Sequence, residues 1–294
     1  MPWESIASVS LAIDSSTGVE PSSLDARANR DRIHLHNLTV ESLETAPYNI
    51  YSPPTSIASM LAAKPISVTW DKLPDDFPLP GDPVDNINQP AIAAALTDSL
   101  QTAQRLPETA LTATNYGICA TTDGRFVVKA PDWVYIDAIS VPRSEIARSY
   151  TPNLQGNVPT IVLEFLSDTE GSKYSSKATY PPGKFFFYER IVRVPNYGIF
   201  EPNSGSLELY RLDENGRYQL VEPNSAGRYW LPELSLFLGG WFGRRENREG
   251  HWLRWWEEGD RLLLWGNERA ELERERAERF LAQLRAAGIE PEDG

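Results

Sequence analysis

Cysteine, histidine and long apolar runs are scarce in this sequence, and each scarcity argues against a class of protein. Cys119 is the single cysteine among 294 residues and lies in an apolar run, so we expect a core residue and no internal disulfide, which fits a reducing compartment. The three histidines form no His-Glu-x-x-His set, which disfavours a zinc hydrolase. No Gly-x-Ser-x-Gly turn is present, which disfavours a serine or cysteine hydrolase.

The apolar stretches are too short to span a bilayer, which needs about 20 residues. The first residues lack a basic segment followed by an apolar one, so no secretory signal is expected. A hydrophobic content of 41% with 11% aromatic residues is enough for a substantial core. We therefore expect a soluble globular protein in the cytoplasm, without membrane contact.

Basic residues are outnumbered, because 28 Lys and Arg stand against 41 Asp and Glu, for a formal net charge of -13. Phosphate binding depends on basic side chains, so this balance argues against a protein that coats nucleic acid with its whole surface. Between Gly124 and Arg193, however, nine basic residues stand against seven acidic ones, a local net charge of +2. A local contact with nucleic acid is compatible with this distribution.

Composition divides the chain into three parts. Residues 1–64 are rich in Ser, Thr, Asn and Pro without a sustained period, which predicts a loosely ordered extension. His34 and His36 alternate with apolar residues there and are expected to be surface side chains rather than metal ligands. Residues 65–265 are expected to form one domain, and residues 266–294 a charged C-terminal helix and tail.

Helical and strand patterns alternate within the predicted domain. The run 90–100 has helical composition with Pro90 in its first turn, and 185–192 has helical spacing that begins at Lys184. Asp123-Gly124 and Asn215-Gly216 are typical of hairpin turns. The expected strands are 116–121, 126–129, 133–138, 160–167, 197–200, 207–212 and 218–221. The pattern predicts an α/β protein with a mixed β-sheet flanked by helices.

Tryptophan is concentrated toward the end of the predicted domain. Such rings could stack on nucleic-acid bases, but a hydrophobic closing layer is the simpler interpretation. The residues are Trp241, Trp252, Trp255, Trp256 and Trp265.

The C-terminal helix, expected over 267–287, carries one short apolar stripe. Ala277, Phe280, Leu281 and Leu284 recur at three- and four-residue spacing. The stripe is shorter than three heptads, so two interpretations stay open. The helix is either a solvated terminal helix or the contact of a homodimer.

Two carboxylates stand in apolar, strand-like runs, where an unpartnered charge is costly to bury. Asp132 lies within 130–136 and Glu164 within 161–167. Asp132 follows a proline and could form a turn, and Glu164 could lie on the solvent face of a strand, although its run does not alternate well. Lys184 follows at the start of the predicted helix. Asp, Glu and Lys together are the residue types of metal-dependent phosphodiester cleavage.

These residues and their neighbours resemble the Uma-two family of restriction-endonuclease-like proteins, within the PD-(D/E)XK nuclease superfamily. The similarity extends from about Ser67 to Leu236, and the order and spacing of its segments are more specific than any single segment. The matching segments are Pro131–Asp132, Val162–Ser167, Gly183–Tyr188, Val194–Pro202 and Leu207–Leu212.

The resemblance implies a restriction-endonuclease-like mixed sheet in which Asp132 and Glu164, on neighbouring strands, bind Mg²⁺ or Mn²⁺. The carbonyl of Phe165 would be a further ligand by the same analogy. Mg²⁺ is in any case a hard cation that one or two carboxylates, waters and a substrate phosphate can hold. An acid from the N-terminal side often joins such sites, and Asp82 and Asp85 are the candidates, without a firm match.

The position of the lysine departs from the simple superfamily motif, which has Lys two residues after Glu where this chain has Leu166. The resemblance assigns the role to Lys184, which would stabilise charge at phosphorus or orient the attacking water. Lys173 and Lys177, in the preceding loop, are its rivals.

The sequence thus predicts a Mg²⁺-dependent endonuclease that hydrolyses DNA phosphodiester bonds, with Asp132, Glu164 and Lys184 as its catalytic residues. The alternative is a non-catalytic binding or assembly protein that retains the nuclease fold. Metal-dependent cleavage separates the two hypotheses.

Overall fold

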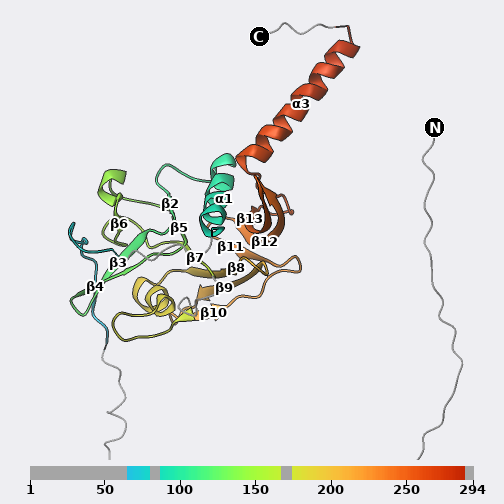
Figure 1. Cartoon of the computed structure of the whole chain (residues 1–294). Coiled ribbons are helices and arrows are strands. Elements are labelled where there is room, and N and C mark those ends of the chain that lie inside the picture. Colours follow the sequence, from blue (N-terminus) through green and yellow to red (C-terminus); the bar gives the residue numbers. More distant parts are fainter. Residues whose placement is uncertain (1–64, 80–86, 167–173, 289–294) are drawn as a thin grey trace, which may run out of the picture. The chain divides into compact units, whose positions relative to one another are not determined.

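A six-stranded mixed sheet forms the centre of the described part of the chain (Figure 1). The computed structural model describes residues 65–79, 87–166 and 174–288. Within this sheet β7 and β8 are parallel, and the other neighbours are antiparallel. In spatial order the strands are β10 (Tyr218–Leu220), β9 (Ser206–Leu212), β8 (Asn196–Glu201), β7 (Ile161–Phe165), β5 (Trp133–Ile136) and β2 (Leu111–Ala113).

A helical segment lies in the connection between the two parallel strands, since parallel neighbours need a crossover. It begins as α2 (Lys184–Phe186) and continues as the π-helix η3 (Phe187–Val192). Arg193 ends it in a left-handed conformation with φ of 62°. The helix predicted to begin at Lys184 is therefore present, although most of it is π-helical.

Alternation along the central strands separates two hydrophobic cores. In β7, Leu163 belongs to the first core and Val162 to the second. Successive side chains of a strand point to opposite faces, so Glu164 lies on the same face as Val162. β5 alternates in the same way, with Trp133 in the first core. Because both faces of the sheet are covered, the apolar runs around the two carboxylates do not alternate in polarity.

Helix α1 (Gln89–Thr102) covers the first face of the central sheet together with a three-stranded antiparallel sheet. Pro90 stands in the first turn of α1, as predicted. The indole of Trp133 donates a hydrogen bond of 3.0 Å to Thr97 Oγ1, which ties the helix to the central sheet. The three strands are β11 (Arg228–Leu231), β12 (Leu236–Arg245) and β13 (Arg248–Trp256).

The second face is covered by α2–η3 and by a smaller sheet, which the short 3₁₀ helix η1 (Arg143–Ile146) accompanies. Its strands are β1 (Val68–Thr69), β3 (Gly117–Thr122), β4 (Arg125–Lys129) and β6 (Ser149–Tyr150). Asp123 and Gly124 form the β3–β4 turn with φ of 48° and 75°, as the Asp-Gly pair predicts. The second predicted hairpin joins β9 to β10. The predicted mixed sheet flanked by helices is confirmed.

The tryptophan-rich end contains a sheet that the sequence did not predict, β11–β13. The residues of β12 and β13 nearest their shared turn are partly or fully exposed, while the opposite ends are buried. In each strand one end is therefore buried and the other exposed, and this change along the strand obscures the two-residue alternation of apolar and polar residues. The hydrophobic-layer interpretation of the tryptophans is confirmed, since Trp252, Trp255 and Trp265 are each at most 3% exposed.

The predicted charged C-terminal helix is present as α3 (Gly266–Ala286), and none of its residues is buried. The predicted extension over residues 1–64, with His34 and His36, lies outside the described residues. Among the helices that are described, none combines the length and apolarity needed to cross a bilayer.

Candidate active site

Asp132 and Glu164 come together across two paired strands. β5 and β7 are antiparallel with Trp133 opposite Leu163, so one residue further Asp132 stands opposite Glu164. Opposite residues share one face of a sheet, with Cβ atoms about 4.5–5.5 Å apart. Glu164 is fully buried at 0% exposed, whereas Asp132, immediately before β5, is half-buried. The structure thus brings the two predicted carboxylates together.

The backbone of β7 orients Asp132. The amide N–H of Phe165 donates a hydrogen bond of 2.6 Å to Asp132 Oδ2. A carboxylate has about four lone-pair positions, so one such bond is compatible with binding a cation. The bond holds the carboxylate of Asp132 against the end of the strand that carries Glu164.

Lys184 supplies the positive charge beside the buried glutamate. Its Nζ donates to Glu164 Oε2 at 2.8 Å and to the carbonyl oxygen of Ala130 at 2.9 Å. The lysine side chain is 22% exposed. A buried carboxylate is costly without a nearby cation, and this ammonium offsets that cost. The predicted trio of Asp132, Glu164 and Lys184 is therefore contiguous.

Lys177 and Lys173 are the other lysines predicted for the role of Lys184. Lys177 is exposed and its backbone, not its ammonium, contacts the start of the helix through Gly183. Lys173 lies outside the described residues, as do the acidic candidates Asp82 and Asp85. Leu166, at the superfamily's lysine position, packs partly buried against the second core.

Gln89 is a neighbour of this site that sequence reasoning missed. It is the first residue of α1 and is 7% exposed, and its Nε2 donates a hydrogen bond of 2.9 Å to the carbonyl oxygen of Phe165. That oxygen has two lone pairs, so an amide and a cation can share it. A glutamine before a helix-opening proline carries no chemical signature, and only the packing of α1 on the sheet brings it to the site.

Tyr188 and Tyr197 lie close to Glu164 on the second face of the sheet. Both are fully buried, and burial raises the pKa of each phenol well above its usual value. The negative charge of Glu164 adds to the increase in both pKa values. The phenols stay neutral, so the carboxylate is backed by a surface of low polarity, which strengthens its interactions with cations.

The residues at this site fit a hard divalent cation. Within the described residues no three or more His, Cys, Asp and Glu side chains converge, so the donors available to a cation here would be the two carboxylates and the Phe165 carbonyl. All three donors are oxygens, which suit Mg²⁺ or Mn²⁺ and not a thiolate- or imidazole-seeking metal. Mg²⁺ commonly uses one or two carboxylates and completes its shell with water and phosphate.

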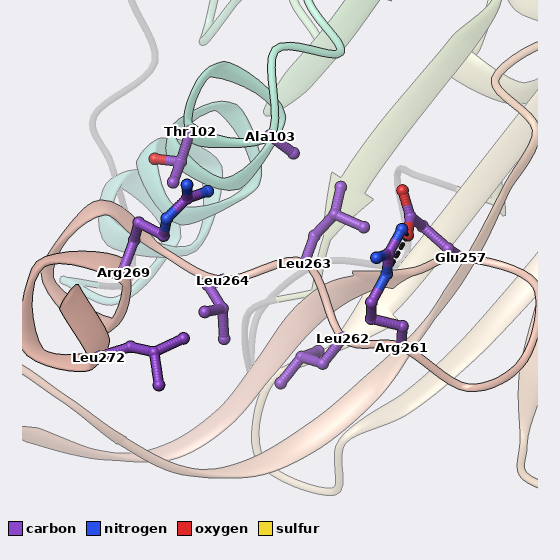
Figure 2. A pocket seen from close by; sticks show the side chains of 9 residues that line it. All are labelled: Thr102, Ala103, Glu257, Arg261, Leu262, Leu263, Leu264, Arg269 and Leu272. Carbon is purple, nitrogen blue, oxygen red and sulfur yellow. Dashed lines mark hydrogen bonds and ion pairs between the residues drawn. The ribbon is translucent and has the colours of Figure 1, made fainter. Parts of the chain in front are cut away.

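A pocket of about 430 Å³ lies elsewhere, between the end of α1, the segment 257–264 and the first turns of α3, which contribute Arg269 and Leu272 (Figure 2). Its charged groups are already paired: Glu257 binds Arg105 at 2.8 Å and also contacts Arg261. None of the catalytic candidates lines it. Cys119 is no nucleophile either, since burial raises the pKa of its thiol to about 11.

The mixed sheet flanked by helices agrees with a protein of the restriction-endonuclease-like class. Residues 80–242 match the Uma2 family, which is described as "Putative restriction endonuclease". The match covers more than half of the chain, and the chain belongs to this family. The family resemblance expected from the sequence is confirmed.

No curated protein matches the chain. Among solved structures, one titled "Crystal structure of a putative nuclease belonging to DUF820 from Anabaena variabilis" is 15% identical to it. The similarity covers 52% of this chain and 76% of that one, with a TM-score of 0.32.

Proposed function

We propose that this protein is a divalent-metal-dependent endonuclease that hydrolyses DNA phosphodiester bonds. The observation that carries the proposal is the convergence of Asp132, Glu164 and Lys184 at the end of β7 in a chain of the Uma2 family. Two carboxylates on one face repel each other unless cations offset them, so a purely structural origin is unfavourable.

Asp132, Glu164 and the carbonyl of Phe165 would hold the metal ion. When bound, Mg²⁺ or Mn²⁺ acts as a Lewis acid that lowers the pKa of water and offsets charge on the phosphate oxygens. The N–H of Phe165 keeps Asp132 turned toward the site, and the amide of Gln89 orients the carbonyl. The protein's own part in catalysis is thus to fix its oxygen donors before the substrate arrives.

Lys184 would act on the phosphate. Its ammonium is held by the Ala130 carbonyl and by Glu164, and its side chain remains partly exposed. A fixed positive charge of this kind stabilises the negative charge that develops on phosphate oxygens in the transition state.

DNA is the proposed substrate because the family description is that of a restriction endonuclease. The chain's net charge of -13 restricts the contact to a local surface, and residues 124–193, which include the site, carry a net charge of +2. We therefore expect weak, salt-sensitive binding to DNA. The C-terminal helix adds a second proposed partner, another copy of the chain.

The test is cleavage of supercoiled and linear DNA with Mg²⁺, with Mn²⁺ or with EDTA. We expect cleavage that requires the metal and that Asp132→Ala or Glu164→Ala abolishes without unfolding the protein. Asp137→Ala is the matched control, since this exposed aspartate follows the other end of β5. Equal activity in either site variant would remove that residue from the mechanism. No cleavage by folded protein under any condition would favour the non-catalytic binding protein.

A further inference from the structure

Helix α3 presents an apolar stripe that the rest of the described chain does not cover. The helix has 21 residues and no buried one. Ala277, Phe280, Leu281 and Leu284 recur at helical spacing and so share one face, and Phe280 is 59% exposed. Single exposed apolar residues are ordinary, but a contiguous stripe on an uncovered helix suggests a contact surface.

The charges of α3 are unevenly divided about residue 279. Residues 272–278 have three Glu and two Arg, and residues 280–286 have one Arg and no Glu. Net charges of -1 and +1 follow. A parallel pair of such helices would place like segments together, whereas an antiparallel pair centred near residue 279 would place each segment opposite the other.

We propose that α3 pairs antiparallel with α3 of a second copy of this chain, through the stripe around Phe280. Such a contact is isologous, because a two-fold axis makes each surface its own complement. With the axis near residue 279, Glu273 and Arg285 lie six residues on either side of it. Glu273 of one chain therefore meets the partner subunit's Arg285.

The ion pairs within α3 do not by themselves account for its apolar stripe and its uneven distribution of charge. Glu273 pairs with Arg269 at 3.1 Å and with Arg276 at 3.0 Å, which supports an isolated helix. An acidic start and a basic end also suit the helix dipole. Neither effect, however, uses the apolar stripe, and neither supplies a partner for Arg285, which has no ion pair within the described residues.

The first turn of α3 is firmly anchored, which leaves the later turns available. Glu268 pairs with the buried Arg254 at 2.6 Å, and the N–H of Gly266 lies 3.3 Å from both carboxylate oxygens of Asp98. Figure 1 shows α3 starting beside α1 and running away from the strands. A helix fixed at one end is preorganised, so less entropy is lost on pairing than for a free tail.

Sedimentation equilibrium of the full chain over a concentration series tests the contact. We expect a dimer of twice the 33.0 kDa chain mass. Phe280→Glu and Leu284→Glu should each raise the dissociation constant at least 10-fold. Ala282→Glu is the matched control, since this exposed residue lies on the opposite face of α3, and it should leave the constant unchanged. A chain that is monomeric at every concentration, or a dimer that tolerates both stripe variants, would overturn the proposal.

Charge reversal tests the antiparallel orientation. Glu273→Arg and Arg285→Glu should each weaken the dimer, and the double variant should recover most of the affinity, because the two positions face each other across the axis. A parallel pair would show no recovery, since each position would face its own copy. Circular dichroism of each variant checks that α3 stays helical. Because α3 contributes nothing to the candidate active site, loss of the dimer and loss of cleavage are separately observable.

Discussion

Two buried ion pairs in this molecule have opposite surroundings. In the pair Glu164–Lys184 the carboxylate is fully buried, and a second carboxylate, Asp132, stands beside it. In the pair Arg254–Glu268 the guanidinium is fully buried, at 0% exposed, and its like-charged neighbour Arg245 is paired with Asp98 at 3.1 Å. Both pairs therefore have a like charge nearby, but each arginine has a carboxylate of its own, whereas Glu164 and Asp132 stand together beside one ammonium. Stability alone does not favour the second arrangement.

The contacts of Arg254 and Glu268 all stabilise the fold around the start of α3. Arg254 binds both carboxylate oxygens of Glu268, at 3.0 and 2.6 Å, donates to the Leu263 carbonyl and lies 3.4 Å from the centre of the Trp265 ring. Glu268 also accepts the N–H of Trp265 and so caps α3. Burial lowers the pKa of Arg254, and Glu268 opposes that shift. The comparison shows that burial of an ion pair does not by itself mark a candidate site, because here each arginine has its own carboxylate.

The largest expected change in stability comes from Glu268→Gln. This variant leaves the guanidinium of Arg254 buried without its anion, and breaking such a pair costs about 3–5 kcal/mol. The free energy of unfolding, measured by urea denaturation, should fall by that amount. Glu271→Gln, on an exposed turn of the same helix, is the control and should change it by about 1 kcal/mol or less. Similar losses in the two variants would show that Arg254–Glu268 is not structural.

Removing the ammonium of Lys184 should lower the rate of cleavage more than the stability of the fold. Lys184→Met removes a fixed positive charge near the phosphate, and we expect a loss of about 100- to 1000-fold in kcat. Because Glu164 then lacks its ammonium, Mg²⁺ should raise the melting temperature of this variant more than that of the unaltered protein. Lys177→Met, at the exposed rival position, should behave as the unaltered protein. Unchanged cleavage by Lys184→Met would exclude the assigned role.

Replacing Gln89 should have a smaller effect than replacing Lys184, and it should act by weakening the binding of the metal ion. Gln89→Leu removes the donor that orients the Phe165 carbonyl, and the loss of such a supporting bond costs about 10- to 100-fold in metal affinity. The Mg²⁺ concentration at half-maximal thermal stabilisation should rise accordingly. Ser99→Ala is the control, because this buried hydroxyl of α1 bonds only to carbonyls of its own helix. An unaltered Mg²⁺ titration in Gln89→Leu would make Gln89 a packing residue.

The smallest expected effect on stability concerns the thiol of Cys119, which is buried. Its pKa rises from 9.0 to about 11 because burial disfavours the thiolate. A raised pKa means that this contribution to stability is present below pH 9.0 and is lost as the pH rises toward 11. The stability difference between the unaltered protein and Cys119→Ala should therefore shrink over that range of pH, and a thiol reagent should label the folded protein slowly at pH 8. Rapid labelling of folded protein would contradict the buried neutral thiol.

Local patterns were sufficient for much of the fold and for selecting three residues that the structure brings together. Hairpin turns at Asp123-Gly124 and Asn215-Gly216, the proline that opens α1 and the helix start at Lys184 depend on neighbours within a few residues. The costs of burying Asp132 and Glu164 are likewise visible in their apolar runs. Such features follow from backbone sterics, hydrogen bonding and solvation, which act over short stretches of chain.

The tertiary structure decided which distant groups meet. Gln89 reaches the Phe165 carbonyl only because α1 packs on the first face of the sheet, 76 residues away along the chain. Lys184 rather than Lys177 meets Glu164 because the crossover between β7 and β8 places the first turn of α2 beside it. β11–β13 form a sheet because a hydrophobic layer against α1 buries their tryptophans. Sequence period specifies which side of an element is apolar, but strand register and the packing of faces determine what that side contacts.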